Sequence, residues 1–432
     1  MLTKNINNSE RIKQISAAVI GNAMEWYDFV IFGFFATIFS QLFFPRNDER
    51  AALLLTLATF GVGFCSRPIG GLFFGLYADK NGRKSALQLV ILLMTIAVAL
   101  IAFAPIYASA GLFGPIMIVV GRLLQGFATG GEFSTSTSFL IEVSPPQYRG
   151  FFGSLQMAGQ ALSILLGTLV GIVVTAEFTN DQIESWAWRI PFILGLLIGP
   201  IGLYIRRHLS ETEEFEKSER KLDSKKLFIT LINSYPAKLA GVFGTTISAT
   251  IYFYIILIYM PTFAKAELHL NLSQSFISQG IGLVILVILT PVVGLLSDVI
   301  GRRPILIISN ILFLITAYPL FVYLIDTHSQ NSFTLVQVIF CTILSGIFGV
   351  LSTVLAEQFP TNVRSTGLAL PYNMAVMIFG GFAPMIVTLL IGELHSLAAP
   401  SYYLIFGALA GLISSKFLVD SNKTVHLELD SN

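Results

Sequence analysis

Two carboxylates, Glu25 and Asp28, stand inside a long apolar stretch near the start of the chain. This stretch runs from about residue 17 to residue 44, and about 20 residues are enough for a helix to cross a bilayer. An ionised side chain at that depth costs at least about 2.5 kcal/mol, so it needs a partner, a wet cavity or a function. Because the two acids are three residues apart, they project from one face of a helix. We predict that this face binds a proton or a solute; an ion pair that only fixes helix packing is the alternative.

Three more ionisable residues, Arg67, Arg122 and Glu132, lie deep in later apolar stretches. Counted at about 1.5 Å per residue, their depths match those of the two acids near the middle of a membrane. Each acid there needs a cation or a proton to offset its desolvation. We therefore predict that the acids exchange a proton against contact with Arg122 or Arg67. The predicted proton-coupling set is Glu25, Asp28 and Arg122.

The composition is that of a polytopic membrane protein. Of the 432 residues, 54% are hydrophobic and 12% are charged, whereas soluble domains have about 25% charged residues. The net charge is +1, and the basic residues are scattered between hydrophobic runs, which argues against a nucleic-acid partner.

The sequence indicates no metal, cofactor or enzyme site. Cys65 and Cys341 lack metal-ligand spacing, and all five histidines lie outside the apolar stretches. Neither a His-Glu-x-x-His pair nor a nucleotide-binding glycine loop occurs, which argues against an intramembrane metallohydrolase and against ATP-driven transport. We predict no metal, no cofactor and no enzymatic activity, and a membrane-embedded sensor or enzyme is the disfavoured alternative.

Twelve apolar stretches are long enough to span a membrane. They cover residues 17–44, 51–78, 86–107, 111–141, 151–176, 188–205, 237–264, 276–296, 305–325, 333–356, 366–391 and 402–419. An even count places both termini on one side, and lysine and arginine gather in alternate connections. We predict an all-α, multi-pass protein of the cytoplasmic (inner) membrane with both termini in the cytoplasm.

The longest polar interval, residues 206–235, mixes both signs of charge and falls between the sixth and seventh stretches. It divides the chain into a six-helix half at 1–205, a cytoplasmic central loop at 206–235 and a second six-helix half at 236–432. Such mixed charge is typical of a solvated helix without chemistry.

The halves repeat each other. The motif Gly-x-x-x-Asp-x-x-Gly followed by two basic residues occurs at 75–84 and again at 294–303. A second pair, at 142–149 and 357–364, places a glutamate seven residues before an arginine. Internal repeats of this kind predict two pseudo-symmetric bundles and a transport site between them near the midplane.

The paired aspartate loops resemble those of the major facilitator superfamily. Further motifs narrow the resemblance to its metabolite:proton symporters, a group that includes proline/betaine, citrate and α-ketoglutarate permeases. These motifs are Gly21-Asn-Ala-Met-Glu-Trp-Tyr-Asp-Phe29, Arg67-Pro-Ile-Gly-Gly71, Arg122-Leu-Leu-Gln-Gly-Phe-x-x-Gly-Gly-Glu132, Trp188-Arg-Ile-Pro-Phe192, Glu211-Thr-x-x-Phe215 and Tyr259-Met-Pro-Thr262.

The resemblance implies that the first and fourth helices of each half line a central cavity. Together with the deep polar and aromatic residues, this gives a predicted substrate-binding set of Trp26, Arg67, Arg122, Gln125, Glu132, Tyr252, Tyr259, Tyr372 and Asn373. Tyr252 and Tyr259 are seven residues apart, so we expect them to share one helix face. The loops imply a gating set of Asp79, Arg83, Glu142, Arg149, Asp298, Arg302, Arg303, Glu357 and Arg364.

The formal charges of the deep residues indicate which kind of solute the site would bind. Three deep acids face two deep arginines, which disfavours a tricarboxylate such as citrate and favours a zwitterion such as proline or betaine. Protonation of both first-helix acids would instead suit a mono- or dicarboxylate such as α-ketoglutarate. We expect a monomer in the lipid bilayer whose partners are a small solute and protons, and whether the coupling ion is a proton or sodium stays open.

Overall fold

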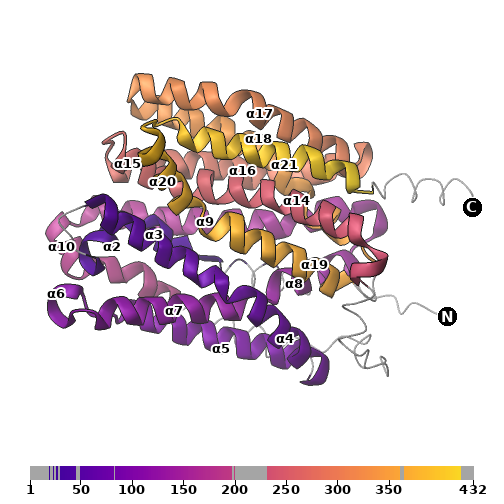
Figure 1. The fold of residues 1–432 in the computed structure, drawn as a ribbon, viewed down its shortest axis with the longest axis horizontal. Helices are drawn as coiled ribbons and strands as arrows, with labels where there is room; N and C mark the ends of the chain where they lie inside the picture. The colour runs from indigo at the N-terminus through magenta and orange to yellow at the C-terminus, as the bar shows by residue number, and fades with distance from the viewer. Residues whose placement is uncertain are drawn as a thin grey trace, which may run out of the picture.

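The computed structural model in Figure 1 consists of helices that run side by side along the long axis of the molecule. The structure describes residues 19, 23, 26–27, 30–44, 49–81, 83–196, 199, 231–360 and 364–419, and none of these lies in a strand. Glu25 and Asp28 lie outside the described residues, as does most of the 206–235 interval. The side chains of Asp79 and Arg83 also lie outside what the structure describes, so their predicted gating role stays a prediction.

The first half of the chain is drawn in colours from indigo to magenta in Figure 1. Its elements are α2 (Ala36–Phe43), α3 (Glu49–Cys65), α4 (Arg67–Asn81), α5 (Arg83–Ala102), α6 (Tyr107–Ala110), α7 (Phe113–Thr129), α8 (Glu132–Val143), η1 (Pro146–Tyr148), α9 (Arg149–Glu177), α10 (Asn180–Ser185) and η2 (Ala187–Arg189).

The second half contains two π-helical segments, η3 and η4. Its elements are α14 (Pro236–Tyr252), η3 (Phe253–Tyr259), α15 (Met260–Ala266), α16 (Leu272–Ile300), α17 (Arg302–Thr327), α18 (Gln330–Ala356), α19 (Arg364–Ala375), η4 (Val376–Gly381), α20 (Ala383–Leu394), α21 (Ala399–Ser414) and η5 (Ser415–Phe417).

Eight helices within the described ranges are long and apolar enough to cross a membrane. They match eight of the twelve predicted stretches, all except the first, third, sixth and twelfth. Shorter apolar helices at Gln88–Ala102 and Ala187–Leu196 stand where the third and sixth are expected, and α21 stands at the twelfth. The all-α membrane fold predicted from the sequence is confirmed.

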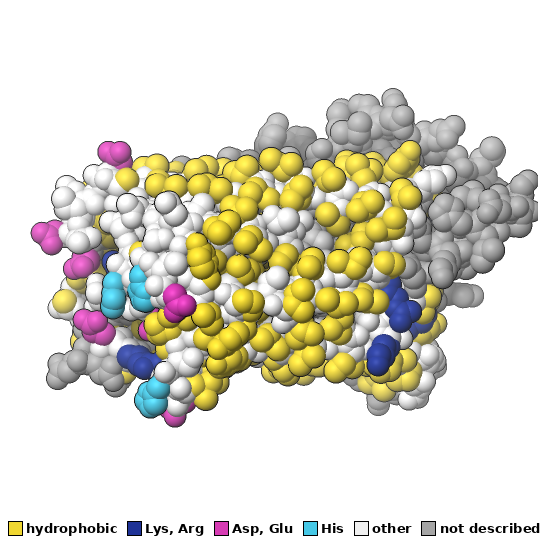
Figure 2. All heavy atoms as spheres, turned by 90° about the horizontal axis from the view of Figure 1, so that it is seen from above, with side chains coloured by type: hydrophobic (Ala, Val, Ile, Leu, Met, Phe, Trp, Pro, Cys, Tyr) yellow, Lys and Arg dark blue, Asp and Glu magenta, His cyan; other side chains and the backbone are white. Residues whose placement is uncertain are grey.

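The outer surface has the polarity of a membrane protein. Figure 2 shows hydrophobic side chains over the middle of the visible face, mostly acidic and histidine side chains at one end, and lysine and arginine at the other. Large apolar side chains on α16 and α17 are strongly exposed, such as Val299 at 77% and Ile288 at 60%. A lipid environment removes the cost of exposing them to water.

The loop repeats mark the end of the molecule that we call the motif end. Here α16 stops because Gly301 takes a φ of 96°, a conformation that glycine adopts without strain, and the chain turns into α17.

The two halves meet closely where α9 lies along α16. A Cβ atom built on Gly150 would come within 2.6 Å of the Gly294 carbonyl oxygen, and one on Gly294 within 2.4 Å of Ser154 Oγ. Only small residues allow helices to approach this closely in a membrane. The contact joins the first half to the second and leaves room for a cavity beside it.

Candidate functional site

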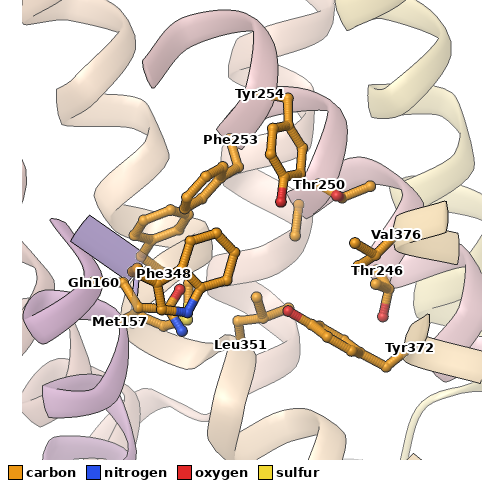
Figure 3. Close-up of a pocket in the computed structure, with 12 residues that line it drawn as sticks. Met157, Gln160, Thr246, Thr250, Phe253, Tyr254, Phe348, Leu351, Tyr372 and Val376 are labelled. Atoms are coloured by element: carbon orange, nitrogen blue, oxygen red, sulfur yellow. The ribbon is translucent and has the colours of Figure 1, made fainter. Parts of the chain in front are cut away.

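A small cavity lies between the halves, with a volume of about 20 Å³, which is room for one or two waters. Trp26 and α9 line it from the first half, and α14, η3, α18, α19 and η4 line it from the second half (Figure 3). The lining residues are Trp26, Met157, Gln160, Thr246, Ala249, Thr250, Phe253, Tyr254, Phe348, Leu351, Tyr372 and Val376.

Aromatic rings form much of the cavity wall. Trp26 and Phe253 lie with their ring centroids 4.9 Å apart, and Phe253 also stacks on Phe348 at 6.0 Å. In Figure 3 the hydroxyl groups of Tyr254 and Tyr372 both point toward the interior of the pocket. The wall therefore offers aromatic faces together with a few hydroxyl and amide groups, and Trp26 and Tyr372 of the predicted substrate set are part of it.

The guanidinium of Arg67 lies next to the cavity. Its Cζ atom is 5.6 Å from the Trp26 ring and 4.4 Å from the Phe64 ring, and the side chain is 3% exposed. Cation–π contacts of this kind stabilise a buried arginine by about 0.5 to 2 kcal/mol. Arg67 thus supplies a positive charge directly behind one of the cavity-lining rings.

Arg122 is buried more deeply in the first half. Its Nη1 donates to Gln125 Oε1 at 2.8 Å, its Nη2 donates to the Phe60 carbonyl at 3.4 Å, and its Cζ lies 4.9 Å from the Phe32 ring. Arg122 and Gln125 were predicted to contact the solute, but neither is among the cavity-lining residues in this closed arrangement. The Phe60 ring contacts both this guanidinium, with the Arg122 Cζ atom 4.7 Å from its centroid, and the Tyr254 ring, at 6.0 Å between centroids.

Glu132 and Asn373 lie where α7 ends and α8 begins. Glu132 is the first residue of α8, where the partial positive charge of a helix N-terminus favours a carboxylate, and it is buried. Asn373 Nδ2 reaches across from α19 to donate to the Gly130 carbonyl at 2.8 Å. Beside it, the rings of Phe133 and Tyr372 stack at 3.9 Å with an angle of 3°. Tyr372 and Asn373 therefore tie the second half to the break between α7 and α8.

The expectation that Tyr252 and Tyr259 share a face is wrong. The hydroxyl of Tyr252 donates to Asn310 Oδ1 on α17 at 2.9 Å, whereas the hydroxyl of Tyr259 is 2.9 Å from Thr388 Oγ1 on α20. Neither residue lines the cavity. The cause is η3, because a π-helix forms i→i+5 hydrogen bonds and its wider turn breaks the 3.6-residue period on which the expectation rested.

Tyr254 is the cavity tyrosine of this span, and the predicted substrate set lacked it. It follows Thr246 and Thr250 at intervals of four residues, and all three line the cavity. Polar side chains at i, i+4 and i+8 in an apolar span mark one helix face, so this spacing was the available signal. Gln160, an amide in an apolar part of α9, was a second one.

At the motif end, Asp298 joins α16 to the start of α9. Its two carboxylate oxygens accept from the backbone N–H of Gly150 at 2.7 Å and of Phe151 at 3.0 Å. Arg302 Nη2 pairs with Asp298 at 2.9 Å and with Glu357 at 3.4 Å. An acid at the N-terminus of a helix is stabilised by the orphan N–H groups and the helix dipole.

One ion pair at the same end crosses between the halves and joins Arg364 Nη1 to Glu142 Oε1 at 3.0 Å. Close by, Thr353 Oγ1 donates to the Arg149 carbonyl at 3.0 Å. Arg303 follows Arg302 at the start of α17 and is partly buried. The structure therefore brings Glu142, Arg149, Asp298, Arg302, Glu357 and Arg364 of the predicted gating set into one polar contact region, the motif-end seal.

Beyond the cavity, toward the other end, the halves meet through glycines and rings. A Cβ on Gly61 would lie 2.3 Å from the Phe382 ring, and one on Gly381 would lie 2.3 Å from the Phe64 ring. Arg50 Nη2 donates to the Thr388 carbonyl at 2.9 Å. We call this contact region, formed by Arg50, Gly61, Phe64, Gly381 and Phe382, the glycine seal.

Comparison with known families gives one consistent result. Residues 14–236 match the family described as "Sugar (and other) transporter", and residues 242–429 match the Major Facilitator Superfamily. The citrate-proton symporter of Klebsiella pneumoniae is 36% identical over 409 residues, which are 94% of this chain and 92% of that protein. The proline/betaine transporter of Escherichia coli (strain K12) is 33% identical over 419 residues, which are 95% of this chain and 83% of that protein.

Solved structures show the same fold. A crystal structure of a D-xylose-proton symporter superimposes with a TM-score of 0.77 at 18% identity, covering 95% of this chain and 98% of the other.

Proposed function

Since the chain belongs to the major facilitator superfamily of transporters, we propose that it moves a small zwitterion, of the proline or betaine kind, across the bacterial inner membrane together with protons. The halves would open alternately at the motif end and at the glycine seal, and the cavity between them would bind the solute. The cavity holds only one or two waters. A solute of this size therefore requires its walls to move apart.

The observation that supports a zwitterion is the aromatic cavity wall with an arginine behind it. Trp26, Phe253, Tyr254, Phe348 and Tyr372 all line the cavity, and no charged residue is among its described lining. Aromatic faces bind quaternary and secondary ammonium groups. Arg67, in contact with Trp26, is placed to bind one carboxylate when the wall opens.

A carboxylate is the second candidate, because the relatives include citrate-proton symporters. Arg67 and Arg122 are both buried in the first half, and an opening that exposed both would create a site for two carboxylate groups. A tricarboxylate would require a third cation, and the described cavity lining offers none.

Proton coupling is assigned to Glu25, Asp28 and Arg122. The two acids flank Trp26 and Tyr27 in the sequence, and Trp26 lines the cavity. We propose that protonation of the acids accompanies solute binding, so that Asp28→Asn abolishes uptake driven by a pH gradient and spares solute exchange. If replacement of both acids by amides left pH-driven accumulation intact, the coupling site would lie elsewhere.

The proposed orientation places the motif end in the cytoplasm, because lysine and arginine concentrate there. Both termini would then be cytoplasmic, and the protein would act as a monomer. Asp79 and Arg83 would join the motif-end seal as the first-half counterparts of Asp298 and Arg302.

The test is transport and competition in proteoliposomes that contain only this protein. We expect labelled betaine or proline to accumulate when the lumen is alkaline, with each zwitterion competing against the other and citrate competing against neither. Tyr254→Leu should weaken betaine binding by about 3- to 30-fold, the equivalent of one cation–π contact. Tyr323→Leu, in the same half but 42% exposed on the outer surface, is the matched control and should bind normally. Competition by citrate with none by either zwitterion would overturn the proposal.

A further inference from the structure

Two glutamines from neighbouring spans bind the π-helical turn of the seventh span. Gln279 of α16 donates from Nε2 to the Leu257 carbonyl at 2.9 Å, and Gln337 of α18 donates from Nε2 to the Ile256 carbonyl at 3.3 Å. The two amides also bond to each other, from Gln337 Nε2 to Gln279 Oε1. Both glutamines and both carbonyl-bearing residues are buried to at least 99%.

This amide pair is costly to place in an apolar span. Burying an amide without partners costs about 1 to 3 kcal/mol, and apolar side chains of the same size would avoid that cost. The pair offsets part of this cost by donating to carbonyls in η3. In the other π-helical segment a single donor does the same, since Tyr403 Oη donates to the Phe379 carbonyl at 2.9 Å. In both segments, therefore, a neighbouring span binds a carbonyl.

The π-turn determines which residues of this span face the cavity. Tyr254, inside η3, lines the cavity, and Tyr259, at the end of η3, bonds to Thr388. Converting η3 to α-helix would rotate the part of the span that follows it relative to the part that precedes it. The rotation is about 100° for each residue by which the helical register shifts. Tyr254 and Tyr259 could then not both keep their present contacts.

We propose that Gln279 and Gln337 are positioning residues for the solute site, because they hold η3 in its π-helical form and thereby keep Tyr254 in the cavity wall. Neither glutamine touches the cavity. They act through the backbone of residues 256 and 257, and the inference rests on the proposed role of the cavity in solute binding. Both helices that provide them also pack on α9 of the first half, so the turn is connected to the contact between the halves.

Gln337→Met tests this role, because methionine preserves length and removes the donor. We expect the purified, full-length protein to lose betaine affinity by an amount that approaches, and does not exceed, the loss of about 3- to 30-fold expected for Tyr254→Leu. In a Tyr254→Leu background the same substitution should change affinity by less than about twofold, because the residue that it positions is already gone. Asn310→Leu is the control, since it removes the buried amide that binds Tyr252 and should lower thermal stability without changing affinity.

Two results would overturn the positioning role. One is unchanged affinity in Gln337→Met despite lowered stability, and the other is an equal loss of affinity with and without Tyr254. If Gln337→Met does not fold, Gln337→Asn, which retracts the donor by one methylene, must show the same pattern. The panel is measured with labelled betaine and with labelled citrate. Failure of betaine to bind the unmodified protein contradicts the zwitterion proposal alone, and the coupling between positions 337 and 254 is then decided on citrate.

Discussion

The two seals on either side of the cavity use opposite chemistry. The motif-end seal consists of charged groups that reach across the halves, with Asp298 on the start of α9 and Arg364 on Glu142. The glycine seal consists of rings that fit against helix backbones, with Phe382 on Gly61 and Phe64 on Gly381, and a single arginine contact at its edge.

This difference matters for alternating access. Charged groups that separate at the motif end regain water, so opening costs only the difference between protein and water partners. Rings that leave the glycine surfaces expose apolar area, and opening there costs roughly 25 cal/mol per Å². A transporter must open each seal in turn, so a ligand or proton needs to shift the balance between them by only a few kcal/mol.

The largest expected effect follows removal of the carboxylate at the motif end. Asp298→Ala leaves two N–H groups of α9 without their acceptor and removes the nearer of the two carboxylates that pair with Arg302. Loss of one partner of a buried charge pair costs about 3 to 5 kcal/mol, and we expect the lower end of that range because Glu357 remains. We expect the motif end to open in most molecules and transport to fall by at least 100-fold, while solute affinity changes little. Spin-label distances between positions 148 and 417 measure the opening. A tenfold weaker affinity with normal cycling would contradict a gating role.

The glycine seal should respond to a single added methyl group. Gly61→Ala places a Cβ 2.3 Å from the Phe382 ring, and overpacking of this kind costs about 1 to 3 kcal/mol. We expect distances between labels at positions 112 and 394 to increase and transport to fall by about 5- to 150-fold. Adding Phe382→Ala to Gly61→Ala should restore transport.

Gly280→Ala is the matched control for this substitution. Its Cβ would meet Thr168 at an ordinary 3.8 Å, so transport should be normal. Equal losses at both glycines would mean that helix propensity, and not the closure of the seal, is responsible.

The ion pair between the halves should contribute less, because it is partly exposed. The Glu142 and Arg364 side chains are 20% and 11% exposed, and partly screened pairs contribute about 1 kcal/mol. Glu142→Arg should speed opening of the motif end by about fivefold. The double exchange of Glu142→Arg with Arg364→Glu should return the opening rate most of the way to that of the unmodified protein. If the opening rate stayed as fast as in Glu142→Arg alone, the pair would not act as a contact between the halves.

Ionic strength should produce the smallest effect and should act at one end only. Raising salt from about 0.1 M to 1 M shortens the Debye length from about 10 Å to 3 Å, which weakens the partly exposed charges of the motif end. We expect the fraction of molecules that show the open label distance across the motif end to rise by about twofold. The distance across the glycine seal should stay constant, and equal shifts at both ends would remove the proposed difference between the seals.

The sequence by itself determined the class of protein and the plan of the chain. Apolar stretches of spanning length are a local property, and so are the repeated loops whose Gly301 must take a positive φ. The depth of Arg67 and Arg122 also follows from counting residues, and both are buried in the structure. These predictions hold because desolvation acts on each segment of a membrane protein independently of its neighbours.

Only the tertiary structure decided which side of each span faces the cavity. Tyr252 and Tyr254 are indistinguishable in type and depth, yet one bonds to Asn310 and the other lines the cavity. The contacts that Asp298 and Glu142 make across the halves likewise join residues more than 140 positions apart in the chain. Helical phase beyond Tyr254 depends on carbonyls bound by Gln279 and Gln337, which come from two other helices. No 3.6-residue period read along this span alone could therefore show that Tyr259 lies away from the cavity.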